Sequence, residues 1–227
     1  MNFKRSWVQH IAATVLLYLM ASLVIANKLD AKATLFQQYQ PIVNAVSKQL
    51  TVNHQIYKKD PKAFQQFLDQ YVRLHWDARS TAKALLGAEN FKALNKHSRQ
   101  RFEVAVETTL LRYAYEGISL YSSQQFQLLD VAISDSGNMG WVQIVMSSKI
   151  IPDLNLDVLV KRNLQGIWKA VDVRFKGITY VAVKKHEFQK ILNKQGIDVL
   201  IASLNEKNNT FFGELCAAAE NMDNQTC

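Results

Sequence analysis

The spacing of hydrophobic residues changes near residue 121, and the change limits the folds that this chain can adopt. Before it, apolar residues recur at helical spacing, whereas from residue 125 to residue 175 they alternate. The alternating part contains four segments separated by short turns, at residues 125–133, 141–150, 156–160 and 168–175. Four such segments predict an antiparallel meander. Because helical segments precede and follow it, we expect an α+β fold with the N-terminal and C-terminal helices packed on one face of a four-stranded sheet.

Capping residues indicate where the helices begin and end. Residues 35–50 form an amphipathic helical stretch that contains Pro41, where we expect a kink. Asp60 followed by Pro61 is a typical helix start. The remaining boundaries are expected as follows: a helix over 76–86 that ends at Gly87, a long helix from its cap at Ser98 to about Tyr121, and two final helices separated by Gly196.

The first 26 residues have the composition of an export signal. Lys4 and Arg5 precede an uncharged stretch, residues 11–26, which is shorter than the roughly 20 residues that span a bilayer. Small residues allow cleavage after Ala26 or after Ala33. An uncleaved membrane anchor is the alternative, because the residues before position 11 could extend the apolar run. With either outcome, we expect the rest of the chain outside the cytoplasm.

Positive charge exceeds negative charge, but it is spread along the sequence. From residue 27 onward the chain has 25 Lys and Arg against 19 Asp and Glu, with no basic run longer than two residues. Nucleic-acid-binding proteins usually show a clustered basic stripe, so we expect no nucleic-acid partner. A dispersed basic surface better fits attraction to anionic membranes or acidic partners.

Both cysteines, Cys216 and Cys227, lie near the C-terminus. In an exported chain they could close a small disulfide loop, and free thiols or an intermolecular bridge are the alternatives. Residues 207–227 as a whole are expected to form a peripheral tail, because a polar stretch separates them from the preceding helix.

No motif for catalysis or metal binding is present. The sequence has no phosphate-binding glycine loop, no paired Cys motif and no His pair at metal-ligand spacing, so we expect no enzyme activity, no metal and no cofactor. One carboxylate, Asp172, interrupts an apolar strand. It could serve as a general base in a cone-shaped pocket, but a structural carboxylate is the favoured interpretation because no second catalytic group is recognisable.

Three blocks of residues resemble the MlaC family, also called the toluene-tolerance family of periplasmic phospholipid-binding proteins. Residues 82–87 match its A-x-x-x-L-G pattern and precede an aromatic residue, Phe91. Residues 100–126 are similar to its long helix and the entry into its sheet, although the glycine usual after Tyr121 is replaced by serine. Residues 168–204 contain its W-x-x-x-D-V and G-I-D-x-L patterns, and Gly177-Ile-Thr179 is similar to its G-V/I-S pattern.

The resemblance implies a carrier without catalytic activity, which holds a phospholipid as cargo in an apolar cavity between sheet and helices. Its domain would cover residues 27–206. It would move lipid between an outer-membrane lipoprotein–porin complex and an inner-membrane ABC transporter with an MCE-type component, and so maintain outer-membrane lipid asymmetry. Burying each CH₂ is worth about 0.8 kcal/mol, so acyl chains alone would supply the binding energy. An enzyme built around Asp172 and a protein-binding scaffold with a solid core are the alternatives.

Helical and strand periodicity then select the residues that would line this cavity. The expected lipid contacts are Phe102, Val106, Leu110 and Tyr115 from the long helix; Val142, Ile144, Met146, Leu156, Val158, Val160, Val171, Val173 and Phe175 from the sheet; and Ile178, Tyr180 and Val181 near the mouth.

Overall fold

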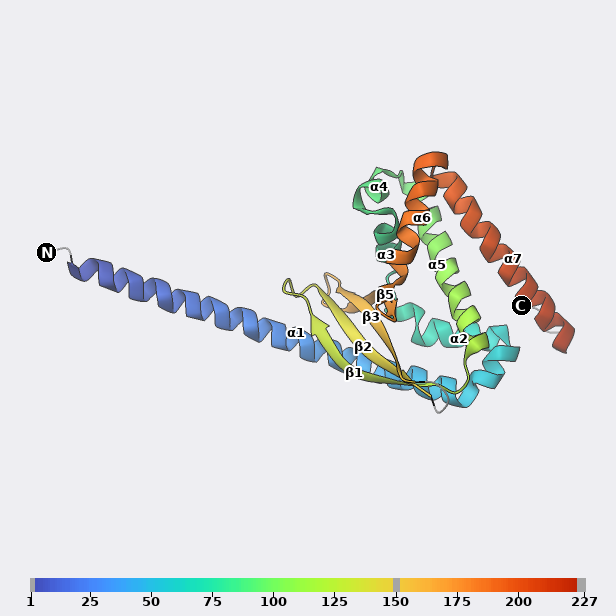
Figure 1. The fold of residues 1–227 in the computed structure, drawn as a ribbon, viewed down its shortest axis with the longest axis horizontal. Coiled ribbons are helices and arrows are strands. Elements are labelled where there is room, and N and C mark those ends of the chain that lie inside the picture. Colours follow the sequence, from blue (N-terminus) through green and yellow to red (C-terminus); the bar gives the residue numbers. More distant parts are fainter. Residues whose placement is uncertain (1–2, 149–151, 224–227) are drawn as a thin grey trace.

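The computed structural model describes the backbone of residues 3–148 and 152–223, with side chains described for 28–148 and 152–218. Its helices, in chain order, are α1 (Phe3–Lys59), α2 (Pro61–Tyr71), a short 3-10 helix η1 (Arg73–His75), α3 (Ala78–Leu86), α4 (Ala88–Ala93), α5 (Lys96–Leu120), α6 (Tyr180–Gln195) and α7 (Ile197–Asp223). Its strands are β1 (Gln125–Ile133), β2 (Met139–Ser147), β3 (Leu154–Arg162), β4 (Trp168–Phe175) and β5 (Ile178–Thr179). Figure 1 shows the sheet between α1 and a group of helices formed by α3 to α7.

The α+β class and the antiparallel meander are confirmed, but the sheet has five strands and not four. Its order is β1-β2-β3-β4-β5. The additional strand β5 follows a tight turn in which both Lys176 and Gly177 have positive φ, at 49° and 83°. Such turns match the twist of a hairpin, so the chain returns along β4 before it enters α6. The expected end of the second strand, residues 149–150, lies outside the described residues.

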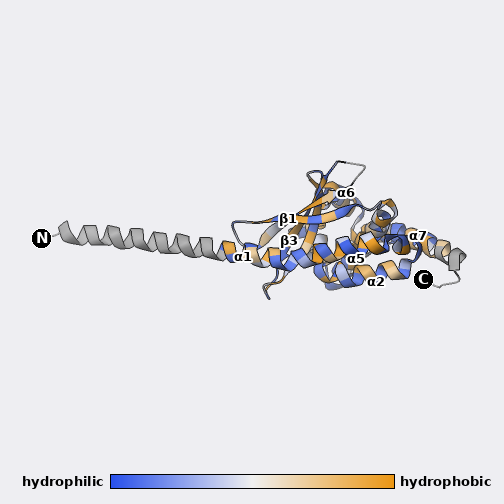
Figure 2. Cartoon of the chain, turned by 90° about the horizontal axis from the view of Figure 1, so that it is seen from below, coloured by the Kyte–Doolittle hydropathy of each residue, from blue (hydrophilic) through white to orange (hydrophobic). Residues whose placement is uncertain are grey.

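Among the described helices, α1 alone lies across the face of the sheet (Figure 1). Its buried residues Ala31, Leu35, Tyr39 and Val43 recur every fourth position and pack against β1 and β2. Figure 2 shows hydrophobic and hydrophilic residues alternating along α1 as it crosses the sheet. The helix is unbroken through Pro41. The helices α3 and α6, in contrast, meet the sheet at β4, which corrects the expectation that all helices cover one face.

The expectation of an export signal falls on residues 1–26, whose side chains lie outside the described set. In the part of the chain with described residues, no helix has both the length and the apolar character needed to span a membrane.

Two helix starts differ from expectation, and one agrees. Asp60 caps α2 by accepting a hydrogen bond from the Ala63 amide, as predicted. Trp76 is not helical but forms a parallel bridge to Ala170 of β4, so α3 starts only after it. The long helix α5 is capped by Asn95, which accepts a hydrogen bond from the Ser98 amide. Ser98 is therefore inside the first turn and is not the cap.

The C-terminal region departs most from the expected peripheral tail. Helix α7 continues through the polar stretch without a break, and its residues Phe211, Phe212 and Leu215 pack against α2 and α5. The ring of Phe212 meets Tyr115 edge to face at 5.5 Å between centroids. Residues 219–227 have no described side chains, so the disulfide between Cys216 and Cys227 stays a prediction.

A buried polar residue fixes α7 on α5. Asn208 is only 1% exposed. Its amide nitrogen donates to the Ala105 carbonyl and to the Thr109 hydroxyl, while its oxygen accepts from the Arg112 guanidinium at 3.2 Å. A polar side chain with partners on the neighbouring helix specifies one register between the two helices.

We therefore predict that Asn208→Ala lowers the free energy of unfolding by about 2 kcal/mol, because it leaves buried partners on α5 without a hydrogen bond. Chemical denaturation measures the change. The next residue, Asn209, is exposed, so Asn209→Ala is a matched control that should change stability by less than about 0.5 kcal/mol. Equal effects of the two substitutions would show that α7 does not dock through Asn208.

Candidate functional site

The expected lipid-contacting residues of the sheet form two rows on one face. Cross-strand pairing places Val142 beside Val158 and Val158 beside Val173. The second row contains Ile144, Leu156, Phe175 and Ile178, again joined by direct pairing. Side chains of directly paired residues point to the same side of a sheet. The predicted shared facing of these strand residues is therefore confirmed.

Val171 does not belong to these rows. A β-bulge between Leu159 and Val160 shifts the pairing, so that Ala170 lies opposite Val160 and Asp172 lies opposite Leu159. The extra residue of a bulge is left unpaired and interrupts the alternation. Ala170 therefore occupies the position that simple alternation assigned to Val171.

Coverage of this apolar face falls steadily from β1 to β5. Beneath α1, Val142 is fully buried and Ile144 is 7% exposed. Leu156 and Val173, farther along the rows, are partly exposed. At the far edge Phe175 is 42% exposed and Ile178 is 61% exposed. Helix α1 thus seals one part of the face and leaves the rest in contact with solvent.

We call this uncovered region the open corner and define it by the following residues. They are Met146, Leu156, Val173, Phe175 and Ile178, from four adjacent strands. All five are among the lipid contacts expected from the sequence. Solvent-exposed apolar side chains that adjoin one another, in contrast to single ones, are typical of a binding surface. The open corner is the part of the sheet best suited to bind an apolar ligand.

The lipid contacts expected on the helices lie in helical clusters and not on the sheet. Phe102 and Val106 are fully enclosed in a cluster of α3, α5, α6 and α7, and Leu110, Tyr180 and Val181 pack against that cluster. Tyr115 belongs to a separate cluster, where its hydroxyl donates to the Pro61 carbonyl at 2.8 Å. The structure therefore divides the expected lining between the sheet and two helical clusters.

Tyr180 is the helical residue nearest in sequence to the open corner. Its hydroxyl is buried and has no hydrogen-bond partner among the described residues. The ring contacts Tyr113 of α5 edge to face, with centroids 5.6 Å apart. Burial raises the pKa of Tyr180 far above its ordinary value, so the hydroxyl stays protonated at physiological pH. Tyr113, which the sequence analysis did not select, is the missed neighbour of this residue.

Asp172 accepts hydrogen bonds from backbone amides near the start of α6. Its carboxylate accepts hydrogen bonds from the amides of Val173 at 2.8 Å and Val181 at 3.2 Å. Burial raises the pKa of Asp172 above its ordinary range, while these amide hydrogen bonds act in the opposite direction. Since it pairs with Leu159, it faces away from the rows of Val158 and Val160. This geometry agrees with the favoured interpretation of a structural carboxylate.

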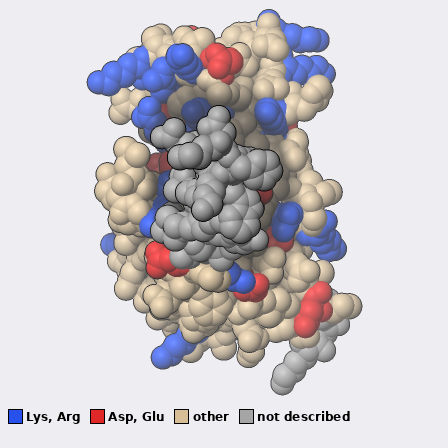
Figure 3. Space-filling model, turned by 90° about the vertical axis from the view of Figure 1, so that its left-hand side faces the viewer, with Lys and Arg blue, Asp and Glu red and all other residues tan. Residues whose placement is uncertain are grey.

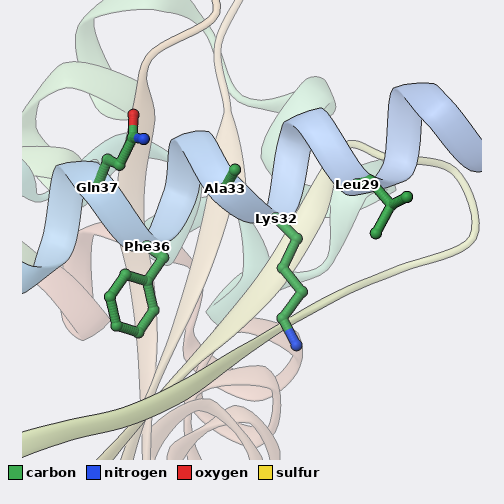
Figure 4. Close-up of a pocket in the computed structure, with 5 residues that line it drawn as sticks. All are labelled: Leu29, Lys32, Ala33, Phe36 and Gln37. Atoms are coloured by element: carbon green, nitrogen blue, oxygen red, sulfur yellow. The ribbon is translucent and has the colours of Figure 1, made fainter.

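Neither of two prominent depressions in the described part of the chain is the enclosed cavity expected between sheet and helices. One surface depression among the described residues, of about 350 Å³, is lined by Leu29, Lys32, Ala33, Phe36 and Gln37 on α1 (Figure 4). The second, of about 360 Å³, is lined by His97, Gln100, Arg101, Val104 and Asn205. Neither contains an expected lipid contact. The described residues thus form an uncovered apolar surface at the open corner, and the neighbouring helices pack against one another.

Comparisons with known proteins agree with this architecture. The family model described as MlaC protein matches residues 40–206. A curated relative, the intermembrane phospholipid transport system binding protein MlaC of Haemophilus influenzae, is 20% identical over 195 residues, which cover 85% of this chain and 91% of the relative. A phospholipid-binding protein from Ralstonia solanacearum, solved in complex with a phospholipid, has 17% identity and a TM-score of 0.63, covering 80% of this chain and 98% of its own. Because the family model spans most of the sequence, the chain belongs to the MlaC family.

Proposed function

We propose that this protein is a periplasmic phospholipid carrier, exported by its N-terminal segment, and not an enzyme. The observation that supports the proposal best is the open corner, where an apolar sheet face becomes progressively uncovered toward Phe175 and Ile178. Acyl chains that lie on this face would remove it from water at about 25 cal/mol per Å². The headgroup would stay outside, since the rows offer no polar side chain to it.

We further propose that acyl chains reach the interior by separating the helices of the cluster that encloses Phe102 and Val106. Phe102, Val106 and Leu110 would then meet the chains from the helical side, and the unpartnered Tyr180 hydroxyl would lie beside them. A packed apolar cluster can open for an apolar ligand without loss of burial, because the ligand replaces the contacts that are broken.

The relatives support a particular place in lipid traffic. The Haemophilus protein is named as the binding protein of an intermembrane phospholipid transport system. By analogy, the carrier would exchange phospholipid with an inner-membrane ABC transporter complex through its MCE-type component. Its other partner would be an outer-membrane lipoprotein–porin complex, and the net result would be the maintenance of outer-membrane lipid asymmetry.

The first prediction concerns the cargo itself. Protein recovered from the exporting cells should appear in native mass spectrometry at the mass of the chain plus a phospholipid. Extraction with organic solvent should return the mass of the chain alone and release lipid into the organic phase. Recovery of the chain alone, with no extractable phospholipid, would contradict the carrier function.

The second prediction concerns the open corner. Leu156→Arg should lower the fraction of lipid-loaded protein about tenfold or more, since a charge is costly to bury beneath an acyl chain. Loading is measured by native mass spectrometry and folding by circular dichroism.

Leu129 offers a matched control for Leu156. It is also a strand leucine, 54% exposed, but lies at the bulge of β1 and away from the open corner. Leu129→Arg should leave loading unchanged. Equal loading of a folded Leu156→Arg variant and the wild type would exclude the open corner as the lipid site.

A further inference from the structure

The excess positive charge of the chain is concentrated on one part of the fold. Residues 78–103 and 180–198, which cover α3, α4, the start of α5, α6 and the first turn of α7, contain ten Lys and Arg against four Asp and Glu. The rest of the chain from residue 27 onward is balanced, with fifteen of each sign. We call these two segments the basic lobe.

The fold brings the two segments of the basic lobe together. The Gln189 side chain of α6 donates to the Leu86 carbonyl at the end of α3, at 3.1 Å. The rings of Phe102 and Phe188 meet edge to face in the cluster beneath them. Figure 3 shows many of the Lys and Arg side chains of one face gathered at its upper end, the end that α3, α4 and α6 form in Figure 1.

Most acidic residues of the lobe are already paired, and most of its lysines are not. Glu103, Glu187 and Asp198 form ion pairs with Arg79, Lys184 and Arg101. Among the described residues, six exposed lysines of the lobe have no ion-pair partner: Lys83, Lys92, Lys96, Lys185, Lys190 and Lys194. The lobe therefore presents an uncompensated positive surface.

The chemistry of this surface favours a membrane over a protein. Lysine is a mobile, strongly hydrated point charge, suited to diffuse attraction, whereas arginine forms the rigid bidentate pairs of specific interfaces. The guanidinium of the remaining arginine, Arg99, is engaged by the carbonyls of Lys92 and Leu94. Protein interfaces also need aromatic or arginine anchors. The phenylalanines of the lobe, Phe91, Phe102 and Phe188, are all buried.

We propose that the basic lobe binds the surface of a membrane that contains anionic phospholipid, through attraction between its unpaired lysines and the lipid headgroups. This interaction is distinct from cargo binding, which we assign to the open corner. Each lysine near an anionic surface strengthens binding about fivefold. The attraction weakens with salt, because the Debye length falls from about 10 Å at 0.1 M to about 3 Å at 1 M.

The test is co-sedimentation of the exported protein, as recovered from cells, with vesicles of phosphatidylcholine alone or with about one third phosphatidylglycerol. The wild type should bind the anionic vesicles at low salt, and high salt should release it. The variant with Lys92, Lys185, Lys190 and Lys194 all changed to Gln should bind about tenfold more weakly or worse. Changing the same four residues to Arg should preserve binding.

A second variant distinguishes the effect of the basic lobe from the effect of net charge. Lys48, Lys59, Lys62 and Lys207 are also exposed and lie outside the lobe, so changing them to Gln removes the same charge. This variant should bind within about threefold of the wild type. Equal losses in the two Gln variants, or no preference of the wild type for anionic vesicles, would overturn the proposal and favour an acidic protein as the partner. Phospholipid loading, measured in parallel, should be unchanged in all variants.

Discussion

The packing of α1 across the sheet is the interaction on which the remaining architecture depends. A sheet with one apolar face needs a layer above it, and α1 provides that layer over β1 and β2 through residues spaced four apart. Gln38 fixes the crossing point. Its side chain donates to the Trp168 carbonyl and accepts from the Trp168 amide, in the manner of a neighbouring strand. Because one helix cannot cover five strands, the far part of the face stays uncovered.

The strand β4 connects this sheet to the helical group. Alternation with Val173 places Asp172 on the face that points away from α1, where its carboxylate accepts a hydrogen bond from the Val181 amide in the first turn of α6. On the same strand, the Val171 carbonyl accepts a hydrogen bond from the buried Thr81 hydroxyl of α3. A residue that resembles a catalytic base in the sequence thus holds two layers together. Its elevated pKa arises from burial that its structural position requires.

Periodicity and capping chemistry made much of this fold predictable. The bounds of β1 and β4 agree with the alternation of their residues, and Asp60 with Pro61 marks the start of α2, because these signals are local. Trp76 was wrongly assigned to a helix, since its extended conformation depends on Ala170, far along the chain. The bulge at Val171 was also invisible, because it arises from pairing between strands.

The extent of α7 shows that a polar residue can lie buried inside a helix when residues far away in the sequence supply its hydrogen bonds. Leu200, Leu204, Asn208, Phe211 and Leu215 recur at helical spacing, but the polar residues around Asn208 led to the prediction of a break. Hydrogen-bond partners on another helix, the Ala105 carbonyl, the Thr109 hydroxyl and the Arg112 guanidinium, allow Asn208 to be buried. The rows of the candidate site were predictable because alternation within a strand is a local signal, as it is for β1. The part of these rows that α1 leaves uncovered was not predictable, because it depends on where one helix crosses the sheet.

The separation of charge and apolar surface has a physical consequence for a carrier. Lysines placed around an apolar opening would bind a headgroup tightly and slow its release. In this chain the five residues that define the open corner are uncharged, with Lys176 over the Phe175 ring as a neighbouring charge, while the six unpaired lysines of the basic lobe lie on α3 to α6. Burial of acyl chains, which is insensitive to salt, and attraction to a membrane, which salt screens, would then be independent contributions. Such a carrier could dock by charge alone and exchange its cargo without first breaking a specific headgroup contact.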